Sequence, residues 1–78
     1  MELREKVGRR IRNWRRLQDI KQEALAERIG VNKSTLSKLE NGAIEINLTT
    51  VEKIATALNM SPEVLLCKDP GDLINKNG

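Results

Sequence analysis

The stretch Gln22 to Gly42, QEALAERIGVNKSTLSKLENG, decides the fold. It predicts two short helices joined by a tight turn. Gly30 stands where the first helix must end with a positive φ, which glycine adopts without steric cost. Asn32 is a favourable N-cap for a second helix that runs from Lys33 to about Glu40.

The second of these helices has two unlike faces. Leu36 and Leu39 are three residues apart and point inward, and the other face has no carboxylate before Glu40. That outer face carries Lys33, Ser34, Thr35, Ser37 and Lys38. A helix anchored by leucines that presents hydroxyl and amino groups suits the major groove of DNA, so we interpret the pair as a helix-turn-helix motif.

The length and the charge distribution of the chain limit which folds and partners are compatible with this motif. Seventy-eight residues allow one small domain with a limited core, which favours a compact helical bundle. Residues 1–42 contain 11 lysines and arginines against 6 acidic residues, a balance of +5. Residues 43–78 contain 3 against 5, a balance of −2. This asymmetry indicates a polyanion bound on one face.

Several functions are disfavoured by what the sequence lacks. One cysteine excludes an internal disulfide and any cysteine-built metal site, and histidine is absent. Without histidine, tyrosine or a phosphate-binding glycine loop, no acid–base pair or activated nucleophile is recognisable. We therefore expect no enzyme activity, no metal and no cofactor. No apolar run approaches 18 residues, so we expect no membrane association and a cytoplasmic location.

A basic helix precedes the motif, over residues 3–17. An apolar stripe of Leu3, Val7, Ile11 and Trp14, continued by Leu17, recurs at helical period. The arginines between them form either a solvated face or a set of phosphate contacts, and we expect Arg12 and Arg16 to contact phosphate. The amide of Gln22, at the N-terminus of the next helix, is also expected to reach a phosphate oxygen. Trp14 is interpreted as a core residue.

Two more helices follow the motif. Asn47 is the expected N-cap of a helix over residues 48–58, and Ser61 followed by Pro62 predicts a short fifth helix to about residue 67. We place the domain at residues 1–67 and expect residues 68–78 to be a polar, mobile tail. In that tail only Leu73 and Ile74 offer apolar side chains to a partner.

These pieces together resemble the lambda-repressor/Cro-like helix-turn-helix regulators. The resemblance covers about residues 7 to 66 and rests on Gln22-Glu23-x-Leu25-Ala26, Gly30-Val31, Ser34 to Gly42 and Val51-x-x-Ile54-Ala55-x-Ala57-Leu58 at matching spacing. It implies an all-α, lambda-repressor-like domain of five helices, usually dimeric, whose third helix enters the major groove of operator DNA.

The resemblance also assigns roles to single residues. It places base reading on Lys33, Ser34 and Lys38, assisted by Ser37 or Thr35. Gln22 and Asn41 match phosphate contacts, and Arg15 and Glu40 match a structural ion pair. The loop Ala43 to Ile46 lacks the basic residues common in relatives, which shifts the expected backbone contacts to the arginine-rich first helix.

We therefore expect a sequence-specific transcriptional regulator that binds an inverted repeat in double-stranded DNA as a homodimer. Apolar side chains beyond what one short helix needs suggest a dimer surface made of Met60, Val64, Leu65 and Leu66. The alternative is an antitoxin-type interaction protein, which binds a partner protein and represses its own operon. An apolar tail that folds on binding would favour that alternative, and this tail offers only Leu73 and Ile74.

Overall fold

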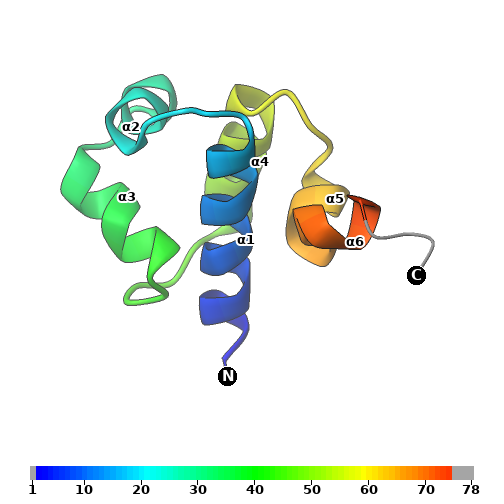
Figure 1. Ribbon diagram of the computed structural model, residues 1–78. Coiled ribbons are helices and arrows are strands. Elements are labelled where there is room, and N and C mark those ends of the chain that lie inside the picture. The colour runs from blue at the N-terminus through cyan, green and yellow to red at the C-terminus, as the bar shows by residue number, and fades with distance from the viewer. Residues whose placement is uncertain (1, 75–78) are drawn as a thin grey trace.

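The structure, a computed structural model, describes residues 2–74 and arranges them in six helices without a strand (Figure 1). The helices are α1 (Leu3–Leu17), α2 (Gln22–Ile29), α3 (Lys33–Glu40), α4 (Leu48–Ala57), α5 (Pro62–Cys67) and α6 (Pro70–Ile74). The predicted all-α class and the lambda-repressor-like arrangement of the first five helices are confirmed. The sixth helix was not predicted.

Local signals in the sequence set most of the helix ends. Gly30 ends α2 with a φ of 79°, in the left-handed region that glycine tolerates. Asn32 caps α3, and its side-chain oxygen accepts a hydrogen bond from the backbone N–H of Thr35 at 2.8 Å. Asn47 and Ser61 cap α4 and α5 in the same way. Gly30 and Asn32 thus fix the two ends of the turn between α2 and α3.

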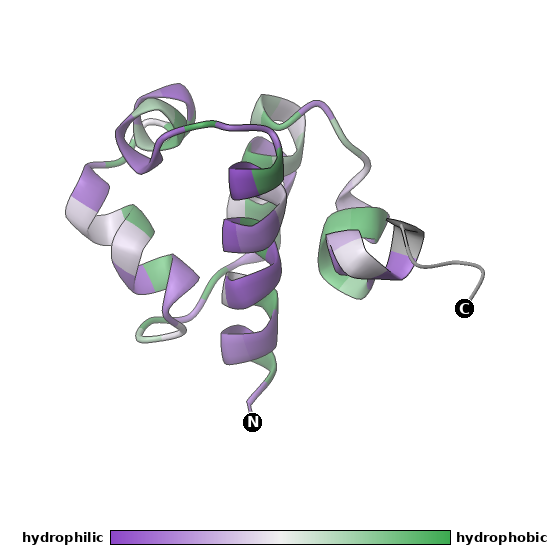
Figure 2. Cartoon of the chain, viewed as in Figure 1, coloured by the Kyte–Doolittle hydropathy of each residue, from purple (hydrophilic) through white to green (hydrophobic). Residues whose placement is uncertain are grey.

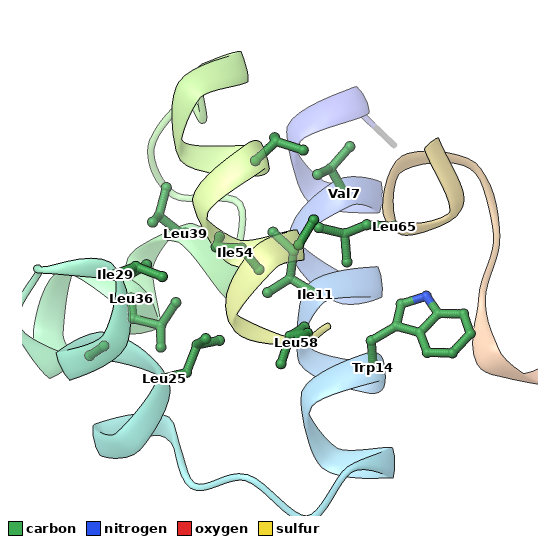
Figure 3. Packing of buried hydrophobic residues seen from close by; sticks show 13 residues of the cluster. Val7, Ile11, Trp14, Leu25, Ile29, Leu36, Leu39, Ile54, Leu58 and Leu65 are labelled. Carbon is green, nitrogen blue, oxygen red and sulfur yellow. The ribbon is translucent and has the colours of Figure 1, made fainter. Parts of the chain in front are cut away.

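The core lies between α1, α2, α3, α4 and α5 (Figure 3). Thirteen buried apolar residues form it: Val7, Ile11, Trp14, Leu25, Ala26, Ile29, Leu36, Leu39, Val51, Ile54, Ala55, Leu58 and Leu65. The predicted stripe of α1 is correct in the middle and wrong at its ends, because Leu3 is 72% exposed and Leu17 is 55% exposed. Both lie at helix ends, where no neighbouring helix covers them.

Helices α1 and α3 approach each other closely at Gly8. A Cβ atom at this position would overlap the carbonyl oxygen of Leu39 and lie 2.8 Å from that of Glu40. A second glycine, Gly42, has a φ of 72° and leaves no room for a side chain beside Glu5. The first half of α1 is thereby seated directly on the C-terminal end of α3.

The opposite side of α1 holds the C-terminal segment. Arg10 donates from Nη1 to the carbonyl oxygen of Leu66 at 2.6 Å, and its Nε lies 3.4 Å from a carboxylate oxygen of Asp69. The indole N–H of Trp14 donates to the carbonyl oxygen of Lys68 at 2.8 Å. Residues after the predicted boundary at 67 thus continue into α6. The mobility predicted for the tail stays a prediction, and residues 75–78 and the side chains of Leu73 and Ile74 lie outside the described part.

Candidate nucleic-acid interface

The outward face of α3 presents the side chains that the sequence assigns to base reading. Lys33, Ser34 and Lys38 are exposed, while Thr35 and Ser37 are half-buried. Leu36 and Leu39 on the other side are almost fully buried and fix the rotation of the helix about its axis. Lys33 Nζ lies 3.9 Å from a carboxylate oxygen of Glu23, an exposed pair that contributes little to stability.

A buried network joins α3 to α1 and α2. Arg15 donates to both oxygens of Glu40, from Nε at 2.7 Å and from Nη2 at 3.0 Å, and its Nη1 donates to the carbonyl oxygen of Ile20. The side chain of Glu40 is 1% exposed and also accepts a hydrogen bond from Gln22 Nε2 at 3.0 Å. Such bidentate, charge-assisted contacts restrict the orientation of both partners. The ion pair implied by the resemblance is thus present and sets the position of the exposed face of α3.

A polar cleft of about 470 Å³ lies beside this network, between α1, the start of α2 and α3. Four of its lining residues are those to which the sequence assigns phosphate contacts: Arg12, Arg16, Gln22 and Asn41. The cleft also contains Lys21, which sequence reasoning missed although it immediately precedes Gln22. Of its two carboxylates, Glu40 is paired with Arg15, so the surplus charge of the cleft is positive.

Arg12, which lines this cleft, has an Nε atom in an unusual environment. Its Nε is buried and, among the described residues, has no hydrogen-bond partner. Leaving a buried donor without a partner costs about 1–3 kcal/mol, more when the group is charged. Since Arg12 lines the cleft, its positive charge adds to the attraction for an anion there. Polar residues lie along the side of α1 that borders it, as Figure 2 shows.

The N-terminus of α2 opens at the same cleft. Its N-cap residue, Lys21, makes no side-chain hydrogen bond to the first turn. Unbonded N–H groups at a helix N-terminus attract anions, because they add to the positive end of the helix dipole. The cleft therefore combines charged side chains with a backbone suited to a phosphate group.

The predicted dimer residues are placed unevenly. Leu65 is fully buried in the core with Val7 and Ile11 (Figure 3), so its assignment to a subunit interface is wrong. A six-residue helix is too short for periodicity to distinguish the inward leucine from its neighbours. Met60, Val64 and Leu66 are half-buried against the same core and retain part of their surface.

Within the described residues, no helix has both the length and the apolar character needed to cross a membrane. The same residues contain no group of three or more side chains that could hold a metal ion.

Comparison with known proteins matches the sequence to one family. The helix-turn-helix family model matches residues 11–65, which is more than half of the chain. The chain therefore belongs to the helix-turn-helix family, as a DNA-binding domain of the Cro/C1 type found in transcriptional regulators.

Three relatives illustrate the match. An uncharacterized HTH-type transcriptional regulator, y4aM of Sinorhizobium fredii, is 38% identical over 66 residues, which are 85% of this chain and 46% of that protein. The chain thus spans about half the length of this relative. The clp gene regulator ClgR from C. glutamicum superposes with a TM-score of 0.83 at 30% identity, covering 85% of this chain and 86% of that one. The P22 c2 repressor, solved in complex with a synthetic operator, gives 0.71 at 35% identity over 81% and 96%.

Proposed function

We propose that the protein recognises a specific operator as a homodimer, with α3 of each subunit in the major groove of one half of an inverted repeat. The observation that carries this proposal is the positively charged polar cleft beside α3, which Arg12, Arg16 and Lys21 line. A phosphate bound there would hold the domain against the DNA backbone while the exposed face of α3 meets base edges.

The roles divide by position. Lys33 and Lys38 are exposed on α3 and suit the O6 and N7 acceptors of guanine, while Ser34 accepts several bases. Arg12, Arg16, Lys21 and Asn41 line the cleft and suit phosphate oxygens. Gln22 already donates to Glu40, so its amide supports the network and leaves only part of its hydrogen-bonding capacity for DNA. Half-site centres are expected about 34 Å apart. The operator complex of the P22 c2 repressor, a relative with the same fold, supports this mode of binding.

Selection of bound fragments from randomised duplex DNA at about 0.15 M salt tests this function, because exposed charges more than about 8 Å apart are largely screened there. We expect an inverted repeat with half-sites about one helical turn apart. Binding without any recovered motif, lost steeply as salt rises, would contradict sequence recognition and leave only attraction between charges.

Two substitutions separate base reading from backbone contact. Lys38→Ala should weaken binding to the operator more than to random DNA, by about 1–3 kcal/mol at the position it reads. Arg12→Ala should weaken both alike and reduce the slope of log K against log salt by about 1. Arg28→Ala is the matched control, because Arg28 is an exposed residue of α2 outside the cleft. Equal losses on operator and random DNA for Lys38→Ala would count against its role in base reading.

A further inference from the structure

Two carboxylates line the cleft beside α3, and their surroundings differ. The side chain of Glu40 is 1% exposed and is bound by Arg15. The side chain of Glu23, in the first turn of α2, is 66% exposed and forms an ion pair with Lys33, whose Nζ lies 3.9 Å from its carboxylate oxygen. A cleft suited to phosphate thus contains an exposed negative charge outside the buried network.

The stability of the fold does not account for this ion pair. Both side chains are more than half exposed, and ion pairs in water contribute little to the free energy of unfolding. Glu23 is also favourably placed without Lys33, because the positive end of the α2 dipole attracts a carboxylate in the first turn. The effect of the pair therefore falls mainly on Lys33.

Lys33 is the first residue of α3, where its own helix offers it no compensation. The first turn of α3 contains no acidic residue, and the positive end of a helix dipole repels an ammonium group. Glu23 supplies the negative charge from the neighbouring helix. The ammonium group is thereby held between the exposed face of α3 and the cleft, which both residues line.

From this position Lys33 has two kinds of acceptor on DNA. A phosphate oxygen carries negative charge, whereas O6 and N7 of guanine are uncharged acceptors. The pair of Lys33 and Glu23 has no net charge, so its attraction for a phosphate is weak, and a phosphate bound to Lys33 would also approach the carboxylate of Glu23. An ammonium group has three N–H donors, so one can face Glu23 while the others reach a base.

We propose that Glu23 determines specificity by holding Lys33 for base edges and disfavouring its contact with phosphate. Discrimination increases when the wrong complex is weakened as well as when the right one is strengthened. The proposal deepens the proposed function and rests on it for the base-reading role of Lys33. Glu23 acts through Lys33, so it is a positioning residue and requires no contact with DNA.

The affinities of Glu23→Gln for the selected operator and for a random duplex of equal length test the proposal. We expect the ratio of the two affinities to fall about two- to fivefold, the range of an exposed ion pair, mainly through tighter binding to random DNA. The slope of log K against log salt on random DNA should steepen by about 1, because Lys33 gains a phosphate.

Glu27→Gln is the matched control for this measurement. Glu27 is an exposed residue of the same helix, carries the same charge and does not line the cleft. Its substitution should change both affinities alike and leave their ratio as in the wild type. Because Glu23 and Glu27 are both exposed, neither variant removes a core contact.

A second experiment asks whether Glu23 acts through Lys33. In a Lys33→Ala chain, Glu23→Gln should leave the ratio of affinities unchanged. Repeated selection with Glu23→Gln alone should relax base choice at the position that Lys33 reads and preserve it at the position that Lys38 reads. A carboxylate that only repelled the backbone would shift the ratio with or without Lys33.

A wild-type ratio for Glu23→Gln, or the same fall for Glu27→Gln, would overturn the proposal. A fall that persists in the Lys33→Ala chain would overturn it too. In these cases the operator motif selected by the wild type would still stand, and with it the proposed function. Failure of the wild type to select any motif would overturn both, so the two failures are distinguishable.

Discussion

Glu40 is the residue on which three elements meet. Its carboxylate accepts hydrogen bonds from Arg15 on α1 and from Gln22 on α2, and almost none of it contacts water. Removing one partner of a buried pair leaves the other charge without compensation. Replacing both partners by apolar residues of similar size avoids that penalty.

We therefore expect Glu40→Gln to lower the free energy of unfolding by about 3–5 kcal/mol. Urea denaturation followed by circular dichroism measures it. Glu52→Gln, at an exposed position of α4, is the control and should change it by less than about 0.5 kcal/mol. The double variant Arg15→Met with Glu40→Leu should lose less stability than Glu40→Gln, and the opposite order would contradict the network as described.

At the scale of elements, the close packing of α1 against α3 depends on Gly8. A methyl group there meets backbone oxygens of Leu39 and Glu40, which cannot move without moving α3. Alanine is otherwise preferred over glycine inside a helix by about 1 kcal/mol. The close contact is the larger effect, because backbone atoms rather than a flexible side chain occupy the space.

Gly8→Ala should therefore destabilise the domain by about 1–3 kcal/mol, the usual cost of overpacking. Gly71→Ala in α6 is a matched control, since no atom lies within 4 Å of its added Cβ. Thermal unfolding of both variants gives the comparison. An unchanged midpoint for Gly8→Ala would mean that the two helices are free to separate.

How far the sequence predicts such features depends on how local they are. Gly30, Asn32 and the Ser61-Pro62 pair act on adjacent backbone, and the helix ends that they predict are correct. The burial of Arg12 Nε arises only in the packed fold, and the sequence indicates only a basic face. Helix α6 was missed because Pro70 and Gly71 look like a turn. Its position depends on contacts of Asp69 and Lys68 with α1, which are distant in sequence.

At the scale of the whole molecule, α1 separates two surfaces. Arg12, Arg15 and Arg16 line the cleft. Arg10 instead contacts Asp69, and Trp14 donates to Lys68, both in the segment after α5. Loss of that segment should then affect stability more than DNA binding. We maintain residues 1–67 as the proposed extent of the DNA-binding unit.

A chain ending at Cys67 should bind DNA within about twofold of the full chain and unfold about 4–8 °C lower, which corresponds to a loss of about 1 kcal/mol in a domain of this size. The fluorescence of Trp14, the single tryptophan, should shift to longer wavelength as its indole loses Lys68 and meets water. A large loss of operator affinity in a folded 1–67 chain would show that the segment contributes to binding.

The two ends of the described chain lie at different places on the molecule, which decides where a label or a tag can be attached. Helix α6 ends on the far side of α1 from α3 (Figure 1), so a fluorophore or surface tether attached there stands clear of the duplex. Glu2, by contrast, lines an apolar groove between the first turn of α1 and the segment that leads into α4. A purification tag fused ahead of Glu2 would begin beside this groove, so it should be cleaved before binding to that face is measured.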